Sequence, residues 1–245
     1  MSLLSPLPQR RRSVNLLIQF LRFPSVFAEI NNLRIHYERS GSGPPLIMLH
    51  GNGEDTGIFS CAAGVLKDYC TVYLVDSRGH GLSQKAPEYH YDLMAEDIHV
   101  LISVLGIEGA ALYGYSDGGI IGLMLSSAHP RDISCLITSG ANTAPDAIDW
   151  CGSFPDPENP VEAMMIHEPH ISGEQLGKIS VPCLVLAGEY DAVRREDTEF
   201  IHRCIRNSEL MIVPGEDHGS YIVNSPVLPE IIKSWLLKIG YIRER

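Results

Sequence analysis

The hexapeptide Gly114-Tyr115-Ser116-Asp117-Gly118-Gly119 carries the strongest indication of fold in this chain. It joins the apolar run 110–113 to the apolar segment 120–128, a pattern typical of a strand, a sharp turn and a helix. Glycines flank the serine as in the G-x-S-x-G pattern, where a Cβ would collide with the neighbouring strand and helix. The hexapeptide therefore predicts Ser116 as a nucleophile at a helix N-terminus. The alternative is a glycine-rich turn with an incidental serine.

Apolar runs and helical periodicity alternate along the rest of the chain. A hairpin is predicted over residues 28–38, and apolar runs predict buried strands at 46–49, 72–75, 110–113, 133–138, 183–187 and 210–213. Helices are predicted at 94–105, 120–128, 195–206 and 227–239. This alternation predicts an α/β fold with a mostly parallel sheet and helices on both faces. Ligands bind such sheets at the carboxyl ends of the strands.

A serine nucleophile needs a base, and the base needs a carboxylate that orients it. Asp191 and His218 follow the last two predicted strands, which gives the chain order Ser, Asp, His expected for this kind of sheet. We therefore expect His218 to act as base and Asp191 to orient it. Asp191 has an alternative role as a helix cap, and Glu189 and Asp217 are the reserve acids.

An oxyanion hole should use backbone N–H groups after the nucleophile and after an earlier strand. Asp117 supplies the first position. The loop His50-Gly51-Asn52-Gly53 supplies the second, at Asn52, with His50 as a structural residue of the loop. The alternative for this loop is a plain glycine turn.

These motifs together resemble those of the α/β-hydrolase superfamily, from about residue 28 onward. The matching segments are His50-Gly51-Asn52-Gly53, Asp76-Ser77-Arg78-Gly79-His80-Gly81-Leu82-Ser83, the turn at Ser116, Gly188-Glu189-Tyr190-Asp191 and Gly215-Glu216-Asp217-His218. The resemblance implies the α/β-hydrolase fold, with a mostly structural loop at 76–83. The His-Gly-Asn loop is also similar to that of haloalkane dehalogenases, but those enzymes use an aspartate nucleophile where this chain has Ser116.

The resemblance and the residues together imply a serine hydrolase with a Ser116–His218–Asp191 triad. The expected substrate is a small or medium carboxylic ester, or a lactone or thioester, and the reaction passes through an acyl-enzyme. Neither a metal nor an organic cofactor is required. The alternatives are a C–C bond hydrolase or cofactor-free haloperoxidase with the same triad, and a non-catalytic receptor or scaffold of the same fold.

The sequence predicts a basic, partly apolar extension over 1–27 and a hydrolase domain over 28–245, with a reduced cap at about 140–180. Superfamily relatives commonly carry a helical lid there, whereas five prolines in this segment allow one or two short helices. Trp150, Phe154, Met164 and Met165 are the candidates for an acyl pocket. Alternatively, these side chains only seal the edge of the domain.

Composition limits the remaining possibilities. The 245 residues are 44% apolar, which is typical of a globular protein, and no apolar run reaches the ~18 residues of a membrane span. The net charge of −11 disfavours nucleic acid as a partner. Six scattered cysteines without metal-ligand spacing favour a reducing, cytoplasmic location.

The N-terminal extension breaks this acidic pattern, because Arg10, Arg11, Arg12 and Arg22 are present there without any acid. We expect an amphipathic helix that lies on the domain or weakly contacts a membrane surface. The segment resembles a secretion signal in its charge, but Arg22 interrupts the apolar region, so secretion is the less favoured alternative.

Overall fold

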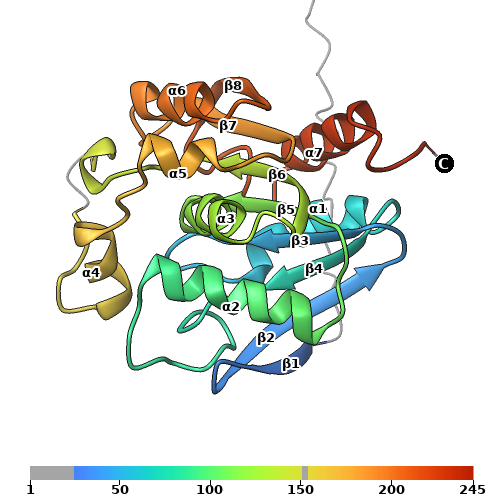
Figure 1. The fold of residues 1–245 in the computed structure, drawn as a ribbon, viewed down its shortest axis with the longest axis horizontal. Helices are drawn as coiled ribbons and strands as arrows, with labels where there is room; N and C mark the ends of the chain where they lie inside the picture. Colours follow the sequence, from blue (N-terminus) through green and yellow to red (C-terminus); the bar gives the residue numbers. More distant parts are fainter. Residues whose placement is uncertain (1–24, 151–153, 245) are drawn as a thin grey trace, which may run out of the picture.

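The computed structural model describes residues 25–150 and 154–244, which form one eight-stranded sheet with helices around it (Figure 1). The predicted N-terminal helix lies outside the described residues. The strands are β1 (Ser25–Ile30), β2 (Leu33–Gly41), β3 (Pro45–Leu49), β4 (Thr71–Val75), β5 (Ala110–Tyr115), β6 (Ile133–Ser139), β7 (Cys183–Tyr190) and β8 (Ser208–Asp217). The helices are α1 (Ser60–Leu66), α2 (Tyr91–Val104), α3 (Asp117–Ala128), α4 (Pro160–His167), α5 (Gly173–Gly177), α6 (Arg195–Cys204) and α7 (Val227–Lys238), and the 3-10 turns are η1 (Thr56–Phe59) and η2 (Pro145–Ala147).

The strand order across the sheet is β1-β2-β4-β3-β5-β6-β7-β8. The hairpin of β1 and β2 is antiparallel and β2 also pairs antiparallel with β4, whereas all pairs from β4 to β8 are parallel. The carboxyl ends of β5, β7 and β8 therefore lie at the same edge of the sheet. This arrangement confirms the predicted mostly parallel α/β fold.

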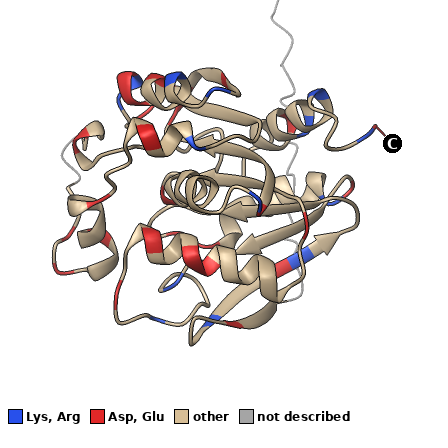
Figure 2. Cartoon of the chain, in the orientation of Figure 1, with Lys and Arg blue, Asp and Glu red and all other residues tan. Residues whose placement is uncertain are grey.

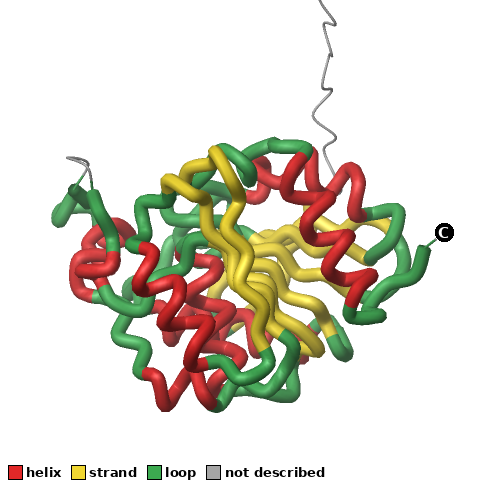
Figure 3. Tube along the Cα trace, turned by 90° about the horizontal axis from the view of Figure 1, so that it is seen from above, coloured by secondary structure: helices red, strands yellow, loops and turns green. Residues whose placement is uncertain are grey.

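Two layers of helices cover the sheet, as Figure 3 shows. One apolar core contains residues of α2, α3, α5 and α6, and the other contains residues of α1 and α7. Alternate side chains of a central strand enter different cores: Ile47 and Leu49 of β3 face the first, and Leu46 and Met48 face the second. Such a strand is apolar throughout because both of its faces are buried.

The structure corrects several predicted boundaries. β1 begins at Ser25, so the sheet includes residues assigned to the extension, and the boundary at residue 28 is wrong. The guanidinium of Arg34 in β2 lies over the ring of Phe27 in β1, 4.4 Å from its centroid, which helps to hold the two strands of the hairpin together. β7 and β8 continue to Tyr190 and Asp217 through segments expected as loops. α1 was not predicted from the sequence.

The segment between β6 and β7 contains η2, α4 and α5. Hydrogen bonds, a β-bridge and buried apolar side chains attach it to the body of the domain. Thr143 N–H and Oγ–H donate to Asp197 of α6, Ile148 forms a β-bridge with Val193, and Glu168 accepts the N–H of Tyr91 at the start of α2. Its role as a cap over a substrate stays a prediction.

The cysteines of the described residues, Cys61, Cys70, Cys135, Cys183 and Cys204, are all free thiols. Burial raises the pKa of Cys70 to about 11 and that of Cys135 to about 12, which makes both poor nucleophiles near neutral pH. None of the described helices is long and apolar enough to cross a bilayer.

Two glycines around Ser116 give a test of how closely β5, α3 and β3 approach one another. A Cβ on Gly114 would lie 2.1 Å from the carbonyl oxygen of Gly118, and one on Gly118 would lie 2.2 Å from that of Leu49. Because backbone atoms cannot yield as side-chain ends do, we expect Gly114→Ala and Gly118→Ala each to lower the free energy of unfolding by about 3 kcal/mol. Urea denaturation measures the change.

Gly177→Ala is the matched control, because the nearest atom to its added Cβ is 3.9 Å away and the glycine ends a helix. We expect a change within about 1 kcal/mol there. Equal losses of stability in all three variants would contradict this account of the turn.

Candidate active site

Ser116 lies between the end of β5 and the start of α3 with backbone angles φ 51° and ψ −114°. A positive φ is unfavourable for a serine, so the surrounding contacts must hold the turn. Its N–H donates to the carbonyl of Ser139 at the end of β6, and its carbonyl accepts the N–H groups of Gly119 and Ile120 in the first turn of α3. These bonds fix the serine at the carboxyl edge of the sheet.

His218 follows β8 directly and lies between Ser116 and Asp191. Its Nε2 is 3.1 Å from Ser116 Oγ, and its Nδ1 is 2.7 Å from Asp191 Oδ1. A carboxylate only accepts hydrogen bonds, so the proton between His218 and Asp191 is on Nδ1, and a neutral ring presents a lone pair at Nε2. The structure thus brings together the three residues predicted from the sequence.

Backbone hydrogen bonds hold the Asp191 carboxylate in place independently of its contact with His218. Its side chain is 3% exposed, and its two oxygens accept the N–H groups of Gly188 and Val193 at 3.1 and 3.0 Å. The reserve acids serve elsewhere: Glu189 accepts the N–H of Gly215, and Asp217 accepts the N–H groups of the two residues after His218. These backbone bonds hold the pKa of Asp217 below its ordinary value.

Sequence reasoning missed two residues that contact the imidazole. Tyr115 lies with its ring centroid 5.1 Å from that of His218. Gly140, which follows β6 with φ 59°, approaches the ring so closely that a Cβ there would lie 2.7 Å from His218 Cε1. Its position two residues after the predicted buried strand 133–138 was the available signal.

The candidate oxyanion donors Asn52 and Asp117 border the serine. Among the described residues, neither backbone N–H has a hydrogen-bond partner. The carboxylate of Asp117 is held by Tyr91 Oη–H at 2.7 Å and by Asn52 Nδ2–H at 2.9 Å. Burial raises the pKa of Asp117, which opposes a full negative charge beside this position. Tyr91 is a further residue that sequence reasoning missed.

A pocket of about 490 Å³ opens above Ser116 and His218, within the range of small-molecule sites. Of the predicted acyl-pocket residues, Trp150 and Met165 line it. The other lining residues are Gly51, Asn52, Glu54, Tyr115, Ile148, Asp149, Tyr190, Asp191, Ala192, Val193 and Asp217.

Met164 and Phe154 do not line this pocket, so the structure corrects both predictions. Met164 is buried in the core on the α2–α3 face, because it lies on the inner side of α4. Phe154 is 64% exposed and contacts Trp150 edge to face, with ring centroids 5.9 Å apart. Adjacent methionines on one helix thus have different surroundings.

Glu54 places a carboxyl group at the pocket wall, a feature that the sequence patterns did not indicate. Its Oε2 accepts the N–H of Gly51 at 3.0 Å. Burial raises the pKa of Glu54, because the charged form loses solvation there. The described lining holds several acids and neither lysine nor arginine, so it disfavours anionic groups.

Potential metal ligands gather elsewhere among the described residues, at Glu96, His99 and His129. None of the three lines the pocket above Ser116. This cluster is therefore separate from the candidate active site.

The loops behind the site are joined by buried polar residues. His50 Nδ1–H donates to Gly51 O at 2.7 Å, and its Nε2 accepts the N–H of Ser77 at 3.0 Å. Asp76 accepts the N–H groups of Thr56 and Leu82. These bonds agree with the structural roles expected for His50 and for the loop 76–83.

Residues 44–163 match a family model described as the alpha/beta hydrolase fold. The chain is 25% identical to human serine hydrolase BPHL over 79% of each chain. It is 33% identical to the uncharacterized hydrolase YraK of Bacillus subtilis over 44% of this chain, a match that spans 41% of YraK.

Solved structures share the fold. A thermophilic esterase from Thermogutta terrifontis superposes with a TM-score of 0.74 at 21% identity, covering 88% of this chain and 99% of the esterase. The predicted α/β-hydrolase fold is thereby confirmed.

His50 predicts a pH-dependent part of the stability. Burial lowers its pKa from 6.5 to about 4, and a second proton on Nε2 would break its bond from Ser77. Between these values the unfolded chain binds a proton that the folded chain does not, so stability falls as the pH falls. We expect His50 to account for about 3 kcal/mol of lost stability between pH 7 and pH 4.

Urea denaturation of the wild type and His50→Gln at several pH values checks this expectation. The glutamine does not titrate, so the difference in unfolding free energy between the two proteins should shrink by that amount towards pH 4. A difference that stays constant with pH would refute the assignment.

Proposed function

Because the chain belongs to the α/β-hydrolase superfamily, we propose that it is a serine hydrolase that cleaves small or medium carboxylic esters, including lactones or thioesters. The observation that carries the proposal is the continuous contact from Ser116 Oγ through the His218 ring to the buried Asp191 carboxylate. The name of its relative, serine hydrolase BPHL, supports a serine as nucleophile.

In the proposed first step, Ser116 Oγ attacks the carbonyl carbon of the ester while His218 Nε2 accepts its proton. The ring then carries a positive charge, which the adjacent Asp191 carboxylate stabilises. Asp191 also keeps the proton on Nδ1, so that Nε2 faces the serine. The two backbone amides that bind Asp191 prevent it from turning away.

Negative charge develops on the substrate oxygen as the tetrahedral intermediate forms. The backbone N–H groups of Asn52 and Asp117 are the proposed donors, and the N-terminus of α3 adds favourable field. His218 then protonates the leaving alcohol or thiol. A water molecule, activated by the same ring, releases the acyl group from Ser116.

The pocket supports a neutral or cationic substrate with an apolar portion. Ile148, Trp150 and Met165 offer apolar surface beside the serine, and the acids of the lining repel carboxylates. Its volume of about 490 Å³ suits a small or medium acyl group.

Removal of the nucleophile tests the proposal. We expect Ser116→Ala to lower kcat for ester hydrolysis by about 10⁴-fold or more. The variant should also no longer be labelled by a fluorophosphonate, because that reagent reacts with an activated serine hydroxyl. Hydrolysis of p-nitrophenyl esters of graded chain length and gel detection of the label provide the two readouts.

Ser103→Ala is the matched control, because Ser103 is exposed on α2 and should not affect either readout. Equal labelling of wild type and Ser116→Ala would contradict the assignment of the nucleophile. Labelling of Ser116 without turnover of any ester would instead favour a C–C bond hydrolase or a haloperoxidase. Ligand binding with neither labelling nor turnover would favour a receptor.

Two neighbouring methionines test the pocket. Met165→Ala removes apolar contact surface from the pocket wall. We therefore expect kcat/KM to fall about tenfold for medium-chain esters, whose acyl chains would reach that surface, and to change little for acetate esters. Met164→Ala instead leaves a cavity in the core and should lower the free energy of unfolding by about 2–4 kcal/mol. Ester panels and urea denaturation separate the effects, and the reverse pattern would refute the assignment.

A further inference from the structure

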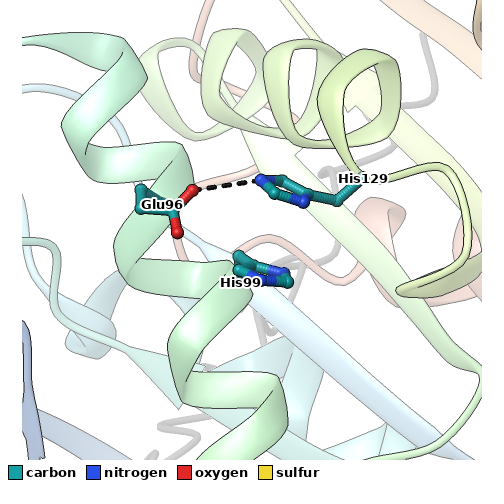
Figure 4. Close-up of side chains that lie close together, drawn as sticks. All are labelled: Glu96, His99 and His129. Carbon is teal, nitrogen blue, oxygen red and sulfur yellow. Dashed lines mark hydrogen bonds and ion pairs between the residues drawn. The ribbon is translucent and has the colours of Figure 1, made fainter.

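Glu96, His99 and His129 form a cluster on α2 and α3 that the proposed hydrolysis does not use (Figure 4). Each offers a ligand atom, and these atoms all lie within 4.8 Å of one another. We propose that this α2–α3 cluster is a Zn²⁺ site. The proposal does not depend on the proposed hydrolase activity.

The packing of the two helices creates the cluster. Glu96 and His99 are three residues apart on α2, so both project from one side of the helix. His129 follows the last residue of α3, where its N–H donates to Leu125 O and closes the helix. α2 packs along α3, which brings the end of one helix to the middle of the other.

The donor set suits zinc. Two imidazoles and a carboxylate are a known combination at zinc sites, where three protein ligands leave a fourth position for water or another ligand. His99 Nδ1 lies 2.6 Å from Asp132 Oδ2, which places its proton on Nδ1 and leaves Nε2 free to bind the ion. A carboxylate behind a ligating histidine in this way orients the ring and strengthens binding.

The local charge also favours a cation. Glu96 Oε2 already lies 3.0 Å from His129 Nε2, and Asp132 adds a second negative charge behind His99. α2 carries acidic residues but neither lysine nor arginine, as Figure 2 shows along the helix. Glu96 in the cluster and Asp132 behind it therefore supply two negative charges to balance a divalent ion.

Binding requires a small rearrangement. The rings of His99 and His129 stack with centroids 3.8 Å apart and planes 9° apart, so their nitrogen lone pairs lie in nearly parallel planes and do not converge on one point between the rings. Ligand atoms about 2 Å from a tetrahedral zinc lie about 3.3 Å from each other. The exposed fractions of the side chains are 34% for His99, 28% for His129 and 47% for Glu96, which leaves them room to turn.

Space for a fourth ligand lies beside the cluster. Glu96 and His129 line a groove of about 450 Å³ that Met124 and Gln175 also border. An ion held by the three side chains can therefore keep a water molecule or a small ligand on that side. The α2–α3 cluster is in this respect an open site rather than a closed structural one.

Calorimetric titration of tag-free, chelator-treated protein with zinc chloride tests the site. We expect one saturable site in the wild type, at least tenfold weaker binding in His99→Ala and in His129→Ala, and about 10–100-fold weaker binding in Asp132→Asn. Unchanged melting temperatures without zinc show that the variants fold.

His90→Ala is the matched control. His90 precedes α2 and also pairs with a glutamate, Glu168, but no third ligand lies nearby among the described residues. Its zinc affinity should equal that of the wild type. Absence of saturable binding up to about 1 mM zinc would overturn the proposal. Wild-type affinity in both His99→Ala and His129→Ala would also overturn it.

Spectra with Co²⁺ in place of zinc distinguish these ligands from the free thiols Cys61 and Cys204. We expect visible bands of a low-coordinate ion without a thiolate charge-transfer band, and their loss in His99→Ala. A thiolate band that survives in His99→Ala would assign the bound metal to the cysteines and overturn the proposal. The ester panel remains a separate measurement, so failure of one proposal leaves the other standing.

Discussion

The constraint on which the rest of this structure depends is the close approach of backbones around Ser116. The chain must leave β5, place a serine at φ 51° and begin α3 within a few residues. That is possible because Gly114 faces the carbonyl of Gly118, and Gly118 faces that of Leu49 in β3. The same contacts therefore hold the central sheet, seat α3 against it and expose the serine. Strain at one residue is offset by packing that extends through three elements.

The partners of Ser116 depend on the outer strands. β7 and β8 run past the predicted strand ends, and their pairing shifts between Gly188 and Tyr190, where a Cβ on Gly188 would lie 2.4 Å from Asp217 O. This irregularity brings Asp191 and His218 back over the sheet edge. Gly140 then lets the imidazole ring approach β6 closely. The positions of Asp191 and His218 relative to Ser116 thus depend on close backbone contacts at the ends of neighbouring strands.

Sequence patterns predicted the central strands well, because a strand buried on both faces is apolar throughout. They failed where burial is partial. The ends of β7 and β8 are polar and exposed, so they read as loops, and α1 is too short for its periodicity to be distinct. Met164 and Met165 are chemically identical neighbours, and the orientation of α4 decided which of them borders the pocket.

By itself, the sequence determined the α/β class, the turn at Ser116 and the order in which Asp191 and His218 follow it, since local periodicity and glycine placement are written along the chain. Only the tertiary structure decided that Asp191, rather than Glu189 or Asp217, meets His218. It also decided that His99 and His129, thirty residues apart, stack on each other. The physical reason is that distances between strands and helices depend on their order, register and packing, which arise when distant segments bury their apolar faces together.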